Sequence, residues 1–445
     1  MPISPARTAA FDILLQVERE NAYASELLHS AQYYGLSFSD HGLATELVMG
    51  VLRWRSLLDR RIAEHSSQRL EKLDAEVLAA LRLAAYQLGF LNRVPPRAAV
   101  HESVELVKRA RKRSAVPLTN AVLRKLAIAT GTLDASTMIA QARGVVQLAD
   151  ASAHPLWLLE RWERQFGFDA LRQICLRDQT VPQISGRLAS PETEHELKEE
   201  SVELGPGQLV TSARRILSGN VTRTLAFQQG RVVIQDEASQ LVALLVGEGK
   251  RFLDCCAAPG GKTRILASHN PDASILAAEL HPHRARLLQK LVTEKNVQII
   301  AADAQNLPVN MRFDRVLADV PCSGTGTLAH NPEIKWRLKP DDLKDLHERQ
   351  AAILRSAMNY VAVAGRLVYS TCSLEPEENV SVIEEVVGEN SAFRVLDCRL
   401  ELQKLRQVGE LVWEDLESLS SGPYLRTIPG VHPCHGFFAA ILQRE

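Results

Sequence analysis

The chain has 445 residues, of which 46% are hydrophobic and 24% charged, a length that predicts two or three globular domains. Its net charge of -1 excludes a uniformly basic nucleic-acid-binding protein, and an aromatic content of 5% argues against a surface that stacks many bases. The sequence has no apolar run long enough to span a bilayer and no evident secretory signal, so we expect no membrane partner.

Residues 1–140 predict a helical domain, because apolar residues recur there at three- and four-residue intervals. Within it lies a dense basic run that consists of Lys108, Arg109, Arg111, Lys112 and Arg113. Such a run beside a helical bundle indicates a phosphate-binding face for RNA. A solvated helix end is an equally good explanation of the run by itself, since charged helix surfaces are common.

Residues 141–229 are less regular and predict a small α/β subdomain that links two larger parts or helps to recognise RNA. From residue 230 to residue 445, short apolar runs alternate with helical patterns. Core strands are expected at 251–255, 274–279, 297–303, 316–319 and 365–370, and residues 395–396 and 436–442 are suited to complete the sheet. This alternation predicts a Rossmann-like, doubly wound domain.

The turn after the first core strand, residues 256–263, ends in Gly-Lys-Thr and has to be compared with a phosphate-binding P-loop. That loop needs a glycine where Cys256 stands, and a dinucleotide fingerprint cannot be written through residues 258–261 either. What remains is a tight strand-to-helix turn in which Gly260 and Gly261 let the backbone approach a ligand closely.

Acidic residues stand at four successive strand ends, namely Asp254, Glu279, Asp303 and Asp319. Each one alone could equally cap a helix or a turn. Together, at the edge where such sheets bind ligands, they can hold a nucleoside-like cofactor through its hydroxyls, its adenine amine and a cationic amino-acid end. S-adenosylmethionine has these features and no phosphate.

Two cysteines follow neighbouring predicted strands, Cys322 in a Gly-rich loop and Cys372 beside small hydroxyl residues. Methylation of a pyrimidine at C5 requires such a thiol, because a thiolate that adds to C6 makes C5 nucleophilic. A base must then remove the C5 proton before the thiol can leave. Spacing alone does not say which of the two thiols attacks.

The seven cysteines include no Cys-x-x-Cys pair, which favours a reduced, cytoplasmic protein over a disulfide or zinc framework. His432, Cys434 and His435 are close in sequence, but a zinc site needs more ligands than these three positions supply. We therefore expect no metal.

Three motifs resemble those of the RNA cytosine-C5 methyltransferases: DCCAAPGGKT at 254–263, DVPCSGTG at 319–326 and STCSLEPEEN at 370–379. The sequence QDEAS at 235–239 is similar to the lead-in of these enzymes, and the N-terminal region with TNAVLR at 119–124 resembles a NusB-type RNA-binding domain. The combination covers nearly the whole chain and is that of the RsmB (Sun/Fmu) family, which methylates 16S ribosomal RNA.

The resemblance implies that Cys372 is the nucleophile and that Cys322 helps to release the product. DNA cytosine methyltransferases, which are similar in chemistry, would instead make Cys322 the nucleophile. S-adenosylmethionine is then expected to contact Cys256, Ala257, Ala258, Pro259, Gly260, Gly261, Lys262, Glu279, Asp303 and Asp319. Asp319 and the carbonyl of Pro321 are expected to face the cytosine.

One position departs from the family pattern, because His435 stands where an aspartate usually precedes Gly-Phe-Phe. The expected substrate is naked or incompletely assembled 16S rRNA, since the target base must leave its stack to reach a thiol. We expect the enzyme to act as a monomer. The catalytic motifs do not exclude transfer RNA, and a non-catalytic NusB-like RNA-binding factor is a further alternative, although such a factor has no use for an activated thiol.

Overall fold

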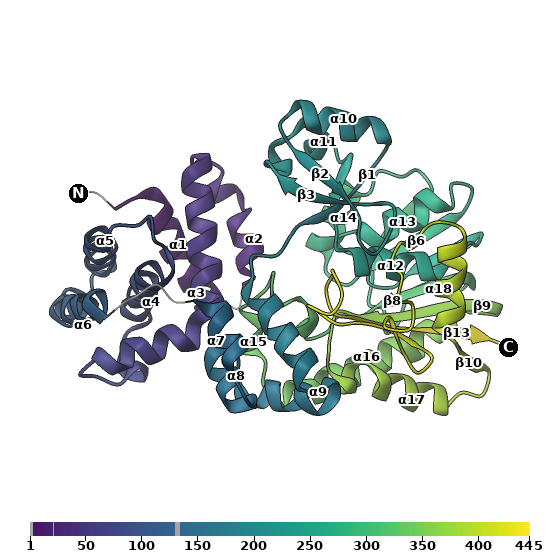
Figure 1. Ribbon diagram of the computed structural model, residues 1–445. Helices are drawn as coiled ribbons and strands as arrows, with labels where there is room; N and C mark the ends of the chain where they lie inside the picture. Colours follow the sequence, from purple (N-terminus) through teal and green to yellow (C-terminus); the bar gives the residue numbers. More distant parts are fainter. Residues whose placement is uncertain (1–2, 21, 130–133) are drawn as a thin grey trace. The chain divides into compact units, whose positions relative to one another are not determined.

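Residues 3–20, 22–129 and 134–445 are described by the computed structural model, which divides into two units (Figure 1). The first unit contains Met1–Val181 together with Leu328–Arg337, and the second contains Pro182–Thr327 and Leu338–Glu445. The expected helical region is confirmed, although residues 21 and 130–133 within it lie outside the described residues.

Helices build the first unit, and α4, which is rich in alanine and leucine, lies at its centre, in contact with α1, α3, α5 and α6. The small side chains of α4 let these neighbours approach closely, so most of its residues are buried. The helices are α1 (Pro5–Glu20), α2 (Ala24–Leu28), α3 (Phe38–His65), α4 (Ala75–Phe90), α5 (Pro96–Arg109), α6 (Val116–Ala129), α7 (Ala135–Gln141), α8 (Val145–Ser152), α9 (Leu156–Gln179) and α15 (Ile334–Arg337), with 3-10 turns η1 (Ala31–Tyr33), η2 (Leu70–Lys72) and η3 (Arg113–Ala115).

The segment Leu328–Arg337 belongs to the helical unit although the sequence predicted one continuous domain from residue 230 to 445. Its polar side chains bond to main-chain groups of that unit. Lys335 Nζ donates to the carbonyl of Arg53 at 2.9 Å, and Trp336 Nε1 donates to the carbonyl of Leu52 at 2.6 Å. Lys335 is fully buried, and burial lowers the pKa of its ammonium group to about 7.

The stretch expected at 141–229 is divided between the two units. Helices α8 and α9 contact α3 and belong to the helical unit. The remainder forms an antiparallel sheet in the order β2-β3-β1-β4, whose last strand lies beyond residue 229. Its elements are β1 (Ser185–Leu188), α10 (Pro191–Glu199), β2 (Glu203–Pro206), β3 (Ala213–Ser218), η4 (Val221–Arg223), α11 (Leu225–Gln228) and β4 (Val232–Ile234).

The larger sheet of the second unit runs in the order β11-β12-β13-β9-β8-β5-β6-β7, with β10 beside β13. Strands β7, β6, β5, β8 and β9 are parallel, and β13 is antiparallel to β9. The strands are β5 (Arg251–Asp254), β6 (Ser274–Glu279), β7 (Val297–Ala301), β8 (Phe313–Asp319), β9 (Val361–Thr371), β10 (Phe393–Leu396), β11 (Ser420–Ser421), β12 (Tyr424–Thr427) and β13 (Phe437–Arg444). The expected doubly wound domain is confirmed, including the two C-terminal strands.

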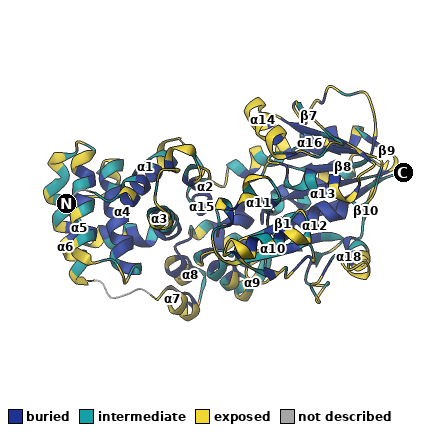
Figure 2. Cartoon of the chain, turned by 90° about the horizontal axis from the view of Figure 1, so that it is seen from above, coloured by how far each residue is buried: buried dark blue, intermediate teal, exposed yellow. Residues whose placement is uncertain are grey.

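Both faces of the central part of this sheet are buried, which explains the apolar runs of its central strands in sequence. Val368 of β9 packs into the core on one face, whereas Leu367 and Tyr369 pack on the other. Most residues of the central strands β5, β8 and β13 are buried, whereas the edge strand β7 has none (Figure 2). The remaining helical elements are α12 (Glu237–Val246), α13 (Gly261–His269), α14 (Pro282–Leu291), η5 (Thr325–Thr327), α16 (Asp342–Asn359), η6 (Pro376–Glu378), α17 (Val380–Gly388) and α18 (Cys398–Gln407).

Glu237, at the start of α12, fixes the loop between β2 and β3. Its fully buried carboxylate accepts the main-chain N–H groups of Gln208, Leu209 and Val210 at 2.6–3.1 Å. Leu209 and Val210 are fully buried, so their N–H groups would be left without a partner if the carboxylate were removed. We therefore expect Glu237→Ala to destabilise the protein by about 3 kcal/mol.

The measurement is thermal unfolding of the Glu237→Ala variant beside Glu248→Ala, which removes an exposed carboxylate from the same region. Glu248→Ala is expected to change the melting temperature little. Equal melting temperatures for both variants would mean that Glu237 does not hold the loop.

Candidate active site

Cys322 and Cys372 lie beside each other at one edge of the larger sheet. Cys322 comes three residues after β8 ends, and Cys372 directly follows β9. Because β8 and β9 are parallel neighbours, their carboxyl ends meet at the same edge. The two sulfur atoms are 3.3 Å apart and both residues are half-buried. The fold thus brings together the two thiols that the sequence singled out.

The two thiols differ in their electrostatic surroundings. The hydrogen bond with Cys372 raises the pKa of Cys322 well above its ordinary value, and burial and the charges of Cys372 and Glu378 raise it further. A thiol with a raised pKa stays protonated at neutral pH. Cys322 is therefore suited to donate its S–H, and Cys372 to accept it.

A half-buried ion pair lies next to the thiols. Lys262 Nζ lies 2.7 Å from Asp319 Oδ2, and Asp319 Oδ1 accepts the hydroxyl of Ser370 at 2.6 Å. Burial alone would lower the pKa of Lys262, but the charge and hydrogen bond of Asp319 and the charge of Cys372 together raise it. Lys262 therefore keeps its positive charge close to Cys372. Its Nζ also lies 5.2 Å from the centre of the Phe437 ring.

The turn predicted to bind the cofactor joins β5 to α13. Gly260 has a φ of 111°, a conformation that favours glycine, and the helix begins at the next residue. Ala257 is buried, and its N–H donates to the carbonyl of Ala278. Burial raises the pKa of Cys256 well above its ordinary value. Cys256 and Ala257 therefore shape the turn from the core side, and Lys262 is directed at Asp319.

The four acids do stand at neighbouring strand ends, but their surroundings differ. Asp254 is fully buried, burial raises its pKa to about 6, and its Oδ1 has no hydrogen-bond partner. Glu279 is buried and accepts the N–H of His281, whereas Asp303 is exposed and accepts the N–H of Gln305. Asp254 thus has an unused acceptor of its own.

Gln235 is a residue that sequence reasoning did not assign to the site. Its side chain is buried, its amide lies against Gly261, and its Oε1 has no hydrogen-bond partner. The buried acceptors of Gln235 and Asp254 therefore flank the same turn. The signal available in the sequence was the place of Gln235 at the start of the QDEAS segment, which resembles the lead-in of the family.

The carbonyl of Pro321 was expected to face the cytosine, and inside the protein it has one hydrogen-bond partner. The carbonyl accepts a hydrogen bond from Gln350 Nε2 at 3.0 Å, and Gln350 is fully buried. At least one lone pair of this carbonyl is therefore used inside the protein.

The basic run at the end of α5 is partly neutralised. Lys108 pairs with Glu105, Arg109 makes two hydrogen bonds with Asp12, and Lys112 lies 3.1 Å from Asp74. Arg111 and Arg113 are exposed, and neither forms an ion pair among the described residues. The structure therefore leaves these two arginines as the best phosphate-binding candidates of the run.

His435, the departure from the family pattern, lies between the thiol loops and α12. Its main-chain N–H donates to Asp236, and its Nδ1 is 3.8 Å from Asp236 Oδ2. The next residue, Gly436, donates its N–H to the carbonyl of Gly326 in the Cys322 loop. The histidine that replaces the family's aspartate therefore lies next to a residue that contacts the Cys322 loop.

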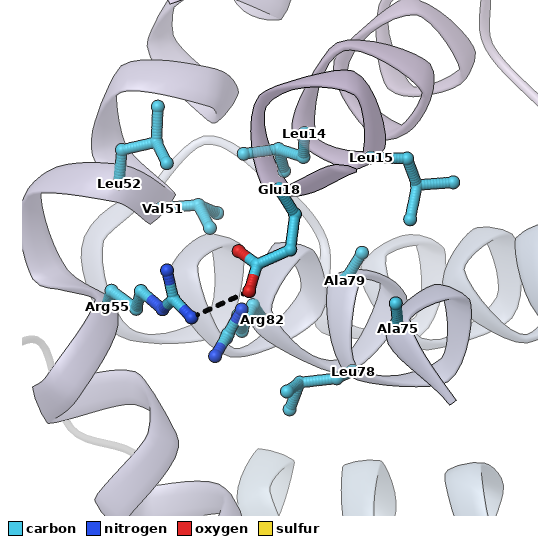
Figure 3. A pocket seen from close by; sticks show the side chains of 10 residues that line it. All are labelled: Leu14, Leu15, Glu18, Val51, Leu52, Arg55, Ala75, Leu78, Ala79 and Arg82. Carbon is cyan, nitrogen blue, oxygen red and sulfur yellow. Dashed lines mark hydrogen bonds and ion pairs between the residues drawn. The ribbon is translucent and has the colours of Figure 1, made fainter. Parts of the chain in front are cut away.

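A separate cavity of about 40 Å³ lies in the helical unit, where Glu18 and Arg55 form an ion pair 2.9 Å long (Figure 3). It is far smaller than the roughly 300 Å³ or more of typical ligand pockets, so we do not assign a cofactor to it. Within the described ranges, His, Cys, Asp and Glu side chains form no group of three that is suited to a metal ion. No described helix combines the length and apolarity needed to cross a membrane.

Comparison with known proteins gives matches to both parts of the chain. The family model of the 16S rRNA methyltransferase RsmB/F matches residues 241–443, and that of the NusB family matches residues 4–127. A Bacillus subtilis protein described as a probable ribosomal RNA small subunit methyltransferase B is 31% identical, with full coverage of both chains. The ribosomal RNA small subunit methyltransferase B of Pseudomonas syringae is 32% identical over 80% of this chain and 81% of its own length.

Among solved structures, that of PH0851 covers both chains fully with a TM-score of 0.80 and 23% identity. A methyltransferase homolog from Pyrococcus horikoshii covers 68% of this chain and all of its own, with a TM-score of 0.56 and 24% identity. At these identities the likeness concerns the fold.

Gly326 gives a test of how tightly the loop of Cys322 is packed. A Cβ atom at Gly326 would lie 2.1 Å from the main-chain oxygen of Gly436, so Gly326→Ala must displace one of the two backbones. We expect a loss of about 2 kcal/mol in stability, measured by thermal unfolding. The control is Gly388→Ala at the end of α17, where a Cβ meets nothing within 4 Å. A Gly326→Ala variant as stable as this control would contradict the close packing.

Proposed function

Because the chain belongs to the RsmB/F family of 16S rRNA methyltransferases, we propose that it methylates C5 of a cytosine in 16S ribosomal RNA. The methyl donor in this proposal is S-adenosylmethionine. The observation that carries it is the pair of sulfur atoms 3.3 Å apart beside the Lys262–Asp319 ion pair. A methyltransferase that used only an amine or hydroxyl of its substrate would need no thiol.

The donor site in this proposal is the edge formed by β5, β6, β7 and β8. The unused acceptors of Asp254 and Gln235 fit a cationic amino-acid end, since each is a buried oxygen in need of a donor. Glu279, at the end of β6, is suited to accept from a ribose diol, and Asp303 stands at the neighbouring strand end. When bound, S-adenosylmethionine supplies a methyl group on a sulfonium that a carbon nucleophile can attack.

The first step assigned to the protein is the addition of Cys372 to C6 of cytosine. An attacking sulfur carries negative charge, and the positive charge of Lys262 and the S–H of Cys322 both lie where they can stabilise that charge during the attack. A new S–C6 bond moves the electron pair of the C5=C6 double bond to C5, which then takes the methyl group. Cys372 is thus the better nucleophile of the two, in agreement with the family resemblance.

Product release is assigned to Cys322. The hydrogen bond with Cys372 is the largest cause of the raised pKa of Cys322. Once the sulfur of Cys372 is bonded to carbon it carries no charge, so this cause is removed and Cys322 becomes a stronger acid. After Cys322 has released its own proton to solvent, its thiolate takes the C5 proton, the C5=C6 double bond re-forms, and Cys372 leaves with the electron pair of the S–C6 bond.

The choice of ribosomal over transfer RNA is supported by the relatives, whose names specify ribosomal RNA of the small subunit. A non-catalytic RNA-binding role is disfavoured by the two thiols and the buried charges around them, because such groups are expensive to bury without a function.

Cysteine variants test the covalent mechanism. Cys322→Ala, mixed with S-adenosylmethionine and naked 16S rRNA, should accumulate a protein–RNA adduct, seen as a retarded band on a denaturing gel. The added change Cys372→Ala should abolish the band, because the nucleophile is lost. Cys372→Ala alone should reduce methyl transfer to background while S-adenosylmethionine still binds.

A band that survives in Cys322→Ala/Cys372→Ala would contradict the assignment of Cys372. If the wild type methylates transfer RNA and leaves 16S rRNA unmodified, the substrate assignment fails and the chemistry stands.

The basic run provides a test of RNA docking. Arg111→Gln/Arg113→Gln should weaken RNA binding and reduce the slope of log Kd against log salt by about 1.4, roughly 0.7 for each phosphate contact to single-stranded RNA. Lys108→Gln/Lys112→Gln removes the same formal charge from side chains that are already paired, and should change the slope less. Unchanged slopes in both variants would identify the run as a solvated helix end.

A further inference from the structure

Glu378 is a fully buried carboxylate that the mechanism above does not use. It ends the short turn η6, a few residues after Cys372, and it is 0% exposed. Its three hydrogen-bond donors are the Ser373 hydroxyl at 2.6 Å and the Ser323 N–H and Gln350 Nε2 at 2.8 Å. None of these donors carries a charge. A negative charge held in the interior by neutral groups is costly, which points to a specific role.

The donors come from both thiol loops. Ser323 directly follows Cys322, and Ser373 directly follows Cys372. Glu378 Oε2 thus holds the first loop, and Oε1 holds the second. The hydroxyl oxygens of Ser323 and Ser373 are also 3.0 Å apart, so the two loops contact each other directly.

Gln350 extends the same connection to the other side of Cys322. Its Nε2 donates both to Glu378 Oε2 and to the carbonyl of Pro321. The residues before and after Cys322 are therefore tied, directly or through one amide, to a single side chain. Because Gln350 comes from α16, this connection also anchors the loop to a helix that packs on the sheet.

We infer that Glu378 is a positioning residue that holds the loops of Cys322 and Cys372 together, so that their sulfur atoms stay in contact. The inference rests on the proposed function for its catalytic consequence. It does not depend on that function for its structural consequence. Glu378 touches neither the cytosine nor the methyl donor in this account.

Two substitutions separate the reach of this side chain from its charge. Glu378→Gln keeps the length but replaces one of the two acceptor oxygens with an NH2 donor, so one of the two loops loses the acceptor that it uses. Glu378→Asp keeps both oxygens and the charge but is one methylene shorter. If the link between the loops matters, both variants are impaired. If only a negative charge is needed, Glu378→Asp behaves like the wild type.

The first experiment measures the contact of the thiols without RNA. Diamide, a dithiol oxidant, accepts two electrons and two protons from Cys322 and Cys372 and leaves them as a disulfide. Mass spectrometry of the linked peptides gives the rate of this reaction. We expect Glu378→Gln and Glu378→Asp to form the disulfide roughly tenfold more slowly than the wild type, because loosened loops lower the effective concentration of the thiols.

The second experiment measures steady-state methyl transfer to 16S rRNA. Both variants should lose roughly tenfold to a hundredfold in kcat, because a displacement of about 1 Å in a catalytic group can cost this much. KM for RNA and Kd for S-adenosylmethionine should remain within about twofold of wild type, since Glu378 binds neither. The matched control is Glu384→Gln on α17, an exposed carboxylate nearby, which should leave all three quantities unchanged.

The outcomes separate this inference from the proposed function. Wild-type rates of disulfide formation in both variants would overturn the positioning role, whatever the substrate proves to be. Slow disulfide formation with no methylation of RNA by the wild type would support the positioning role and refute the proposed function. If Glu378→Gln loses both kcat and thermal stability while Glu378→Asp matches the wild type in both, Glu378 has a charge-dependent structural role. That outcome would also overturn the inference.

Discussion

The pairing of β8 with β9 is the constraint on which the candidate site depends. In their parallel register, Asp319 stands opposite Ser370, and the two cysteines follow within three residues. A shift of the register by one residue would turn the side chains at the strand ends to opposite faces of the sheet. The register is held by side chains that alternate between two cores, such as Val316 and Leu317 of β8. Burial on both faces thus fixes the geometry at the edge.

Charge is arranged around the thiols in two layers. The outer layer contains Lys262 and Asp319, which form an ion pair within reach of Cys372. The inner layer contains Glu378, whose neutral donors come from the two loops and from α16. In the proposed reaction the outer layer stabilises a negative sulfur, and the inner layer keeps the two sulfur atoms at a fixed separation. The low polarity of the surroundings strengthens both effects.

The helical unit contributes differently. Its core depends on α4, and most of its basic run is already neutralised by carboxylates of the same unit. The number of basic residues in a sequence therefore overestimates the positive charge available to RNA, because some of these residues form ion pairs with carboxylates of the same protein. The NusB-family match of residues 4–127 identifies the kind of domain, and the geometry narrows its candidate phosphate contacts to Arg111 and Arg113.

The sequence by itself determined the helical region, the doubly wound sheet and the strand ends at which Asp319, Cys322 and Cys372 stand. These features depend on local periodicity and on motifs of adjacent residues, which the order of amino acids displays directly. It did not reveal that residues 328–337 fold with the helical unit, or that Gln235 lies against the cofactor turn. It also gave no sign that Glu378 joins the two thiol loops. Those facts arise from contacts between residues that are distant in sequence, such as Ser323 and Glu378, and only the packing of the sheet and its helices brings them together.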